Sequence, residues 1–309
     1  MKVYLQPDVY SRGIVRVANA LMQYAPSSLQ LVSHASDADL EVIHVYGRHD
    51  TVSRRIELLR QKKKPFAMIQ YCLRSTMCPS TWDWFEMWEK AKLVWSYYDL
   101  PELCRQDGIG SDLPDGSYTM PGFNFYHAPL GVDPKIFRDT NIEKGARILI
   151  NGKKRFVILA SAQHALSESA RECAFAAKRV KRSMFFLGHE LRRGPDIVCK
   201  NNLTDEQVAD YYSQCEFISG LRRIEGFELP VIEGALCGAR PIVFDRQETR
   251  KWFSDFAIFI PETNRDGVIS ELELIFNENI PPISDKQKDI IRDRFNWETI
   301  IKNFWNKIL

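Results

Sequence analysis

Two carboxylates stand eight positions apart, at Glu225 and Glu233. Gly226 and Phe227 follow the first, and an apolar run at 241–244 predicts a strand directly after the helix that would carry the second. A carboxylate can bind sugar or ribose hydroxyl groups, and a glycine lets backbone N–H groups approach a phosphate. The spacing therefore predicts a nucleotide-sugar site at the edge of a parallel sheet, although either glutamate could instead be a solvated helix residue.

Four further residues could complete such a site. Arg222 and Arg223 directly precede the carboxylate pair, and arginine suits bidentate contacts to phosphate. Asn201 and Leu203 follow an expected strand and are candidates to line a pocket for the base. The two arginines could equally belong to a solvated loop.

The first half of the chain offers candidates of other types. His44 lies in an apolar run, where a hydrogen-bonded core histidine is expected. Gly13 opens an expected helix at 12–23 and could let a ligand approach, although a plain turn is an equal alternative. Tyr71 lies near the end of the expected strand at 65–72 and is a candidate to contact the acceptor. The D-x-D pattern at 37–39 precedes a strand in a polar turn and is interpreted as solvated, so no metal site is predicted.

The stretch 82–98 is dense in aromatic residues. Trp84, Trp88 and Ala91 share one face of an expected helix. Three interpretations remain open: packing between a helix and a sheet, an acceptor groove in which the rings stack on sugars or bases, and contact with a membrane interface. Basic clusters at 62–64, 153–155, 178–182 and 192–193 could attract an anionic acceptor, but solvated surface is the default interpretation.

Composition sets wider limits. The chain has 309 residues, 45% hydrophobic and 27% charged, with a formal net charge of +2, which is typical of globular domains and gives no global attraction to a polyanion. Its seven cysteines are scattered without a C-x-x-C pair, which favours a reducing cytoplasmic compartment. No signal peptide and no membrane-spanning run is expected.

Expected strands and helices alternate along the whole chain, which predicts parallel sheets built from βαβ units. A loop rich in Gly, Pro, Asp and Ser at 107–124 separates two such series. The fold class predicted is therefore α/β with two Rossmann-like domains. The expected bounds are 1–128 and 129–284, with a C-terminal helix at 285–309 that returns to the first domain.

Four motifs occur in an order that resembles retaining glycosyltransferases of the GT-B fold, family 4 in particular. These are the Gly-Val-Asp and phenylalanine motif at 129–137, the helix at 203–212, the E-x7-E block at 225–233, and Phe-Asn-Trp-Glu at 295–298. The resemblance is nearly continuous from position 123 onward and weak before it. It implies two domains facing a cleft, with the last helix crossing back to the first domain.

The resemblance also implies roles. Glu225 would contact the transferred sugar, Glu233 the nucleotide ribose, and Gly226 and Phe227 the sugar and phosphates, with no cofactor and no metal. The family often places a catalytic histidine in the first domain near the reacting carbon, and His44 matches that position best, with a core role as the alternative. The Gly-Arg and lysine with which the family usually holds the diphosphate are absent from the sequence after the strand at 156–160. Arg222 and Arg223 are the candidates to replace their charge.

The function expected is retaining transfer of a sugar from a nucleotide-diphosphate sugar to a polysaccharide, a lipid-linked glycan or a modified nucleic acid, in the cytoplasm or peripherally at a membrane. The alternative is a nucleotide-sugar-binding or scaffold protein with little catalysis, which the missing phosphate clamp favours. A GT-B phosphorylase or epimerase is a third option, although the carboxylate and histidine arrangement expected of an epimerase is not found.

Overall fold

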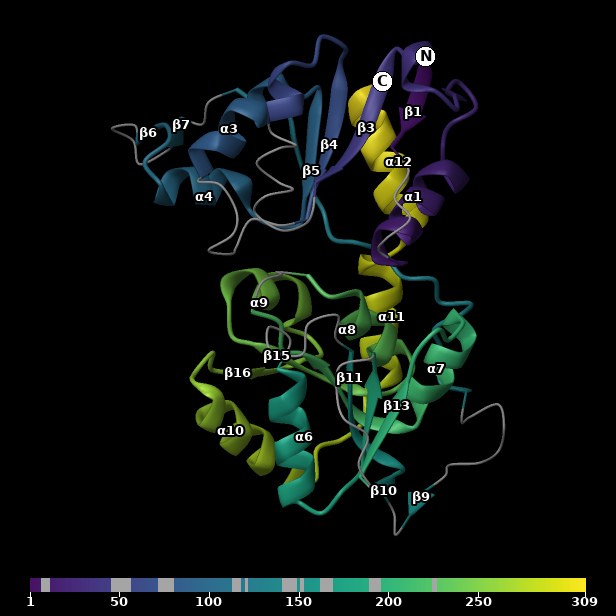
Figure 1. Ribbon diagram of the computed structural model, residues 1–309, viewed down its shortest axis with the longest axis vertical. Helices are drawn as coiled ribbons and strands as arrows, with labels where there is room; N and C mark the ends of the chain where they lie inside the picture. The colour runs from purple at the N-terminus through teal and green to yellow at the C-terminus, as the bar shows by residue number, and fades with distance from the viewer. Residues whose placement is uncertain are drawn as a thin grey trace. The chain divides into compact units, whose positions relative to one another are not determined.

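A computed structural model describes residues 1–6, 12–45, 57–71, 81–112, 118–119, 122–140, 149–150, 153–161, 169–188, 196–223 and 227–309. The chain divides into two compact units. The first contains 1–130, 225–227 and 297–309, and the second contains 131–224 and 228–296. Each is described by itself below (Figure 1).

The first unit is built on a six-stranded sheet in the order β2-β1-β3-β4-β5-β8. Every neighbouring pair is parallel. Its strands are β1 (Lys2–Leu5), β2 (Gln30–Leu31), β3 (Leu40–Val45), β4 (Phe66–Gln70), β5 (Leu93–Ser96) and β8 (Phe125–His127). The central strands β3, β4 and β5 are buried throughout, as expected for a parallel sheet covered on both faces.

The helices of this unit are α1 (Arg12–Gln23), α3 (Thr81–Lys90), α4 (Leu100–Gln106) and α12 (Trp297–Ile308). It also contains a short 3-10 helix at Ala35–Asp37 and an antiparallel pair of short strands, β6 (Ser111–Asp112) and β7 (Tyr118–Thr119). Helix α12 packs on α1 and β5. The indole N–H of Trp305 donates to the carbonyl of Leu21 at 3.3 Å, and the hydroxyl of Tyr126 donates to the carbonyl of Ile300 at 2.9 Å. The C-terminal helix is therefore part of the first unit.

The second unit has its own six-stranded sheet in the order β13-β12-β11-β14-β15-β16, again parallel at every pair. Its strands are β11 (Phe156–Ser161), β12 (Met184–Leu187), β13 (Ile197–Lys200), β14 (Cys215–Gly220), β15 (Arg240–Phe244) and β16 (Ile258–Ile260). A two-stranded antiparallel pair, β9 (Leu149–Ile150) and β10 (Lys153–Lys154), precedes β11.

The helices of the second unit are α6 (Ala170–Arg179), α7 (Asp205–Ser213), α8 (Leu229–Leu236), α9 (Gln247–Phe253), α10 (Arg265–Asn277) and α11 (Asp285–Arg294). Helices α6 and α10 lie side by side (Figure 1) and bury one apolar cluster against the sheet. Helix α7 begins with a capping box, in which Thr204 and Gln207 bond each other's backbone N–H groups.

The expected α/β class is confirmed, and one detail of the prediction changes. The segment 285–309 forms two helices instead of one, because the chain leaves helical geometry at Phe295, the C-cap of α11. Helix α11 belongs to the second unit and only α12 to the first. Beside this break, Val132 and Asn296 form an isolated bridge, and the N–H of Val132 donates to the carbonyl of Phe295.

Candidate functional site

The carboxyl ends of β14, β15 and β16 lie next to one another at one edge of the second sheet, because the three strands are parallel neighbours. Arg222 and Arg223 follow β14, Arg246 follows β15, and Glu262 follows β16. Ligands of open α/β sheets bind outside this edge. The residues that come together here are therefore the first candidates for a binding site.

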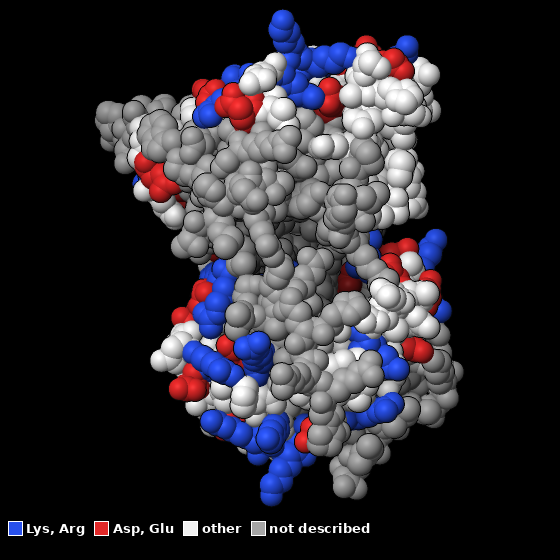
Figure 2. Space-filling view, in the orientation of Figure 1, with Lys and Arg blue, Asp and Glu red and all other residues white. Residues whose placement is uncertain are grey.

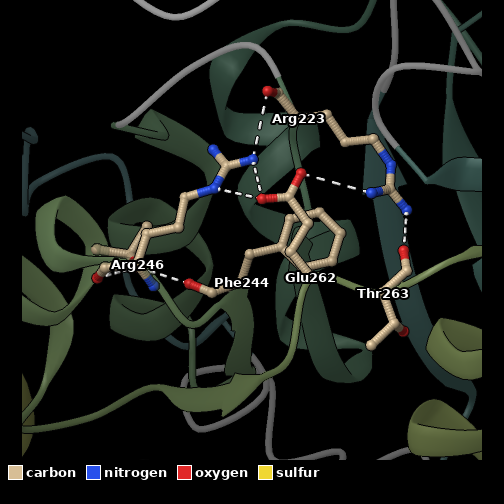
Figure 3. Close-up of polar contacts among 6 residues, drawn as sticks. Arg223, Phe244, Arg246, Glu262 and Thr263 are labelled. Carbon is tan, nitrogen blue, oxygen red and sulfur yellow. Dashed lines mark hydrogen bonds and ion pairs between the residues drawn. The ribbon is translucent and has the colours of Figure 1, made fainter.

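Arg223, Arg246 and Glu262 form one ionic cluster, which we call the arginine cluster (Figure 3). Both Nε and one terminal nitrogen of Arg246 contact Oε2 of Glu262, at 2.8 and 2.6 Å, and Arg223 contacts Oε1 at 3.4 Å. The two guanidinium groups also lie over the ring of Phe244, at 5.0 and 5.6 Å from its centroid. The loops after β14, β15 and β16 are thus tied together by charge.

Arg222 has a different partner. Its Nε lies 2.8 Å from Oε2 of Glu228, whose side chain is only 6% exposed. Glu228 is the N-cap residue of α8, so its negative charge stands at the positive end of the helix dipole. The arginine expected to hold a phosphate therefore neutralises a carboxylate of the protein itself.

Glu233 lies in the middle of α8 and is 2% exposed. The hydroxyl of Tyr212, on α7, donates to its Oε2 at 3.3 Å. Burial first, and then the charge of Glu233, raises the pKa of the nearby Cys237 thiol well above its usual range. A buried carboxylate at the junction of α7 and α8 is a strong hydrogen-bond acceptor, which is the property a ribose contact would use.

Helix α8 is seated closely on the sheet. A Cβ added to Gly220, the last residue of β14, would lie 2.4 Å from Val231 of α8 and 2.9 Å from Val243 of β15. A Cβ added to Gly234 would lie 3.0 Å from Ile218. The glycines therefore let the helix that carries Glu233 approach the strand directly.

Asn201 and Leu203 follow β13, the outermost strand of the same sheet. Asn201 is exposed, and Leu203 is half-buried. Between them Asn202 adopts a left-handed backbone conformation, with φ of 52°, and turns the chain into α7. The sheet order puts these residues on the opposite side of β14 from the arginine cluster. The carboxyl ends of the strands are thus followed by two separate groups of polar residues.

In the first unit, His44 is 1% exposed in β3, and its Nδ1 lies 2.9 Å from the hydroxyl of Tyr71. The two rings stack with centroids 5.9 Å apart. Tyr97 donates its hydroxyl to the carbonyl of Tyr71, and Nε2 of His127 lies 3.2 Å from the carbonyl of Tyr97. The carboxyl ends of β3, β4, β5 and β8 are thereby linked by polar aromatic side chains.

Three side chains that were candidates for ligand contacts are buried against other groups of the protein. Trp84 and Trp88 are 1% and 0% exposed, and Trp88 donates its N–H to Gln70 at 3.3 Å. Their burial favours the packing interpretation over an acceptor groove. Phe227 is 3% exposed, and its ring lies 5.5 Å from that of Tyr97. Gly13 lies in the first turn of α1, as expected.

Two predicted site residues, Glu225 and Gly226, lie outside the described residues. Within the part of the chain that is described, no three His, Cys, Asp or Glu side chains are grouped to hold a metal ion. In that same part, no helix is both long enough and apolar enough to cross a bilayer.

The basic clusters are partly neutralised. Lys62 contacts Glu41 at 2.6 Å, and within 178–182 Arg179 contacts Glu273 at 2.7 Å. Lysine and arginine side chains are spread over the described surface of the second unit, with acidic side chains between them (Figure 2). Lys62 and Arg179 thus each have an acidic partner, and the cluster at 192–193 lies outside the described residues.

No family model and no curated protein matches the chain, but solved structures do. A sucrose-phosphate synthase from Thermosynechococcus elongatus superimposes with a TM-score of 0.73 and 11% identity, over 99% of this chain and 97% of that one. HepE of Anabaena, solved with UDP, gives 0.69 and 10%, covering 99% of each chain. The chain has the GT-B fold. AviGT4, a glycosyltransferase of avilamycin A biosynthesis, gives 0.55 and 13%, over 99% and 96%.

Within this GT-B chain, sequence reasoning missed Arg246, Glu262, Tyr212 and Glu228. Each acts through a partner on another strand or helix, and a single sequence carries no signal for such pairs. Arg246 does follow an expected strand at the edge where β14 ends. That position alone could have placed it among the candidates.

Proposed function

We propose that the chain is a retaining glycosyltransferase that resembles family 4 and moves a sugar from a nucleotide-diphosphate sugar to an acceptor. The observation that carries this proposal is a GT-B fold whose second sheet has arginines and the Glu233 helix at its carboxyl edge. HepE, which shares the fold, was solved in complex with UDP, and AviGT4 is a glycosyltransferase. Both neighbours support a nucleotide-sugar donor.

In this proposal, Glu233 binds the ribose hydroxyl groups and exchanges its hydrogen bond with Tyr212 for one with the ligand. Asn201 and Leu203, after β13, line the base. Glu225 contacts the transferred sugar, with Gly226, Phe227 and Gly13 near the sugar and phosphates. His44, supported by Tyr71, is the proposed catalytic histidine of the first unit, and the acceptor is a glycan, a lipid-linked glycan or a nucleic acid.

The charge that develops on the leaving nucleotide must be stabilised as the glycosidic bond breaks. Arg222 contacts Glu228 at the start of α8, where backbone N–H groups also favour an anion. A diphosphate that draws Arg222 away takes this cation from the buried charge of Glu228. Removing one partner of a buried pair costs about 3–5 kcal/mol. We therefore expect weak binding of the nucleotide unless Arg222 serves both anions at once.

A second candidate function rests on that same contact. Arg222 and Arg223 each contact a carboxylate of the protein, Glu228 and Glu262. Arginines that already contact the protein's own carboxylates are less available to stabilise a leaving diphosphate. This favours a protein that binds a nucleotide sugar with little catalysis. Turnover separates the two functions.

The test measures nucleotide affinity and sugar transfer on the same variants. We expect Glu233→Ala to weaken nucleotide binding and Glu225→Ala mainly to lower turnover. Glu278→Gln, an exposed position after α10, serves as the charge-removal control and should change neither. Nucleotide binding without hydrolysis or transfer of any donor would favour the binding protein. Equal nucleotide affinity in the wild type and Glu233→Ala would remove the ribose role.

A further inference from the structure

Two guanidinium groups of the arginine cluster contact the one carboxylate of Glu262. The nearby Arg250 forms its own pair with Asp245, with contacts of 2.5 and 2.6 Å. Among the described residues, Arg223 and Arg246 thus share one carboxylate, while Arg250 has a carboxylate of its own.

The two arginines of the cluster differ in what they can offer. The side chain of Arg246 is 7% exposed, and two of its nitrogens lie within 2.8 Å of one oxygen of Glu262. Arg223 is 30% exposed, and its contact with the other oxygen of Glu262 is long, at 3.4 Å. Arg246 thus fixes the carboxylate, while Arg223 is the more accessible cation.

Arg223 is also held in a defined orientation. Its guanidinium lies over the ring of Phe244, and one nitrogen donates to the carbonyl of Thr263 at 3.1 Å (Figure 3). Arg246 donates to the carbonyl of Arg223 at 3.3 Å, which ties the backbone of this loop to α9. A planar cation fixed in this way is suited to a carboxylate or a phosphate.

The cluster is separate from the residues proposed for the nucleotide. Glu233 faces α7 through Tyr212, and Asn201 follows β13 at one edge of the sheet. Arg223 directly follows Arg222 in the chain, but its guanidinium contacts Glu262 and Thr263 after β16, whereas Arg222 contacts Glu228 at the start of α8. A single nucleoside diphosphate on the α7 side therefore does not account for a second cationic group.

We propose that Arg223, positioned by Arg246 and Glu262, binds an anionic oxygen group other than the diphosphate, a carboxylate or phosphate carried by the transferred sugar or by the acceptor. This inference rests on the proposed glycosyl transfer and narrows its substrate to a sugar that bears charge. Arg223 is a specificity-determining residue for that group. Arg246 and Glu262 are positioning residues.

The experiment compares matched neutral and charged ligands by calorimetry. One arm uses UDP-glucose and UDP-glucuronate, which differ by a carboxylate on the sugar. The other arm uses glucose and glucose 6-phosphate, without nucleotide. We expect the charged ligand to bind about tenfold more tightly in one arm, which corresponds to about 1.4 kcal/mol. The arm that responds identifies the donor sugar or the acceptor as the source of the charge.

Variants then show which residue causes the preference for the charged ligand. Arg223→Ala should abolish the preference for charge and leave the affinity for UDP within twofold, whereas the exposed Arg250→Ala control should preserve both. Glu262→Gln removes the competing negative charge and should raise the affinity for the charged ligand. The folding of each variant is checked by its melting transition.

Three results would overturn the inference. These are no charge preference in either arm, a preference that survives Arg223→Ala, and an equal loss of UDP and charged-sugar binding in Arg223→Ala. The last would make Arg223 part of the diphosphate site. Failure of the proposed function is a different result, namely no binding of UDP, GDP, ADP, CDP or dTDP. The arm without nucleotide would still test Arg223 in that case.

Discussion

The contact between β14 and α8 predicts a large effect of a single methyl group at Gly220. In Gly220→Ala, the new Cβ would lie 2.4 Å from Cγ2 of Val231 and 2.9 Å from Cγ1 of Val243. Both valines are fully buried, and β-branched side chains have little rotamer freedom. The helix must therefore move away from the strand, because neither neighbour can rotate aside.

Overpacking of this kind costs about 1–3 kcal/mol. For a unit of this size, each kcal/mol lowers the melting temperature by about 2–4 °C, so we expect a decrease between about 2 and 12 °C. Since α8 carries Glu233, its displacement should also weaken nucleotide binding. Thermal unfolding and nucleotide titration on the same sample measure both effects.

Gly122→Ala is the matched control, because no heavy atom lies within 4 Å of its added Cβ. Gly220→Ala combined with Val231→Ala removes the closest clash, so the two changes should cost less together than the sum of their separate effects. A Gly220→Ala variant that melts like Gly122→Ala, or strictly additive effects in the double variant, would refute this account of how α8 is seated.

The remaining predictions concern buried polar groups. Burial raises the pKa of Cys104 to about 11 and of Cys173 to about 12, so the native state keeps these protons up to a higher pH than the unfolded chain does. Stability from each thiol is complete below pH ~9 and falls by up to about 1.4 kcal/mol per pH unit until the native pKa is reached. Urea unfolding from about pH 8 to about pH 11 should show this loss, and Cys173→Ala should reduce the slope. Trp305→Phe removes the N–H that bonds α1 and should destabilise the first unit by about 1–3 kcal/mol in thermal unfolding; an unchanged melting temperature would contradict that contact. Tyr212→Phe removes the hydroxyl that orients Glu233 and should change the affinity for the nucleotide in titration, whereas an unaltered affinity would separate Tyr212 from the site.

Local signals made most of the fold predictable. Apolar runs and the alternation of strands and helices predicted both sheets. Some contacts depend on neighbouring residues alone, such as the bond that Asp99 accepts from the N–H of Glu102 at the start of α4. The atoms of the Thr204 capping box likewise lie within one turn of the chain.

The site was less predictable because its partners are distant in the sequence. Arg223 and Glu262 are 39 positions apart and meet only because β14, β15 and β16 are adjacent. The pairing of Arg222 with Glu228 depends on how the loop turns into α8. Periodicity placed Trp84 and Trp88 on one helix face, but it could not show whether that face meets a sheet or a ligand.

A thermal-shift panel of UDP, GDP, ADP, CDP and dTDP on the wild type and Glu233→Ala tests the proposed nucleotide site. A ligand at about 100 times its dissociation constant adds about 2.7 kcal/mol of stability, which is enough to raise the melting temperature by several degrees. We expect one diphosphate to raise the melting temperature of the wild type and not that of the variant. No shift with any nucleotide, or equal shifts in both proteins, would contradict the proposed site.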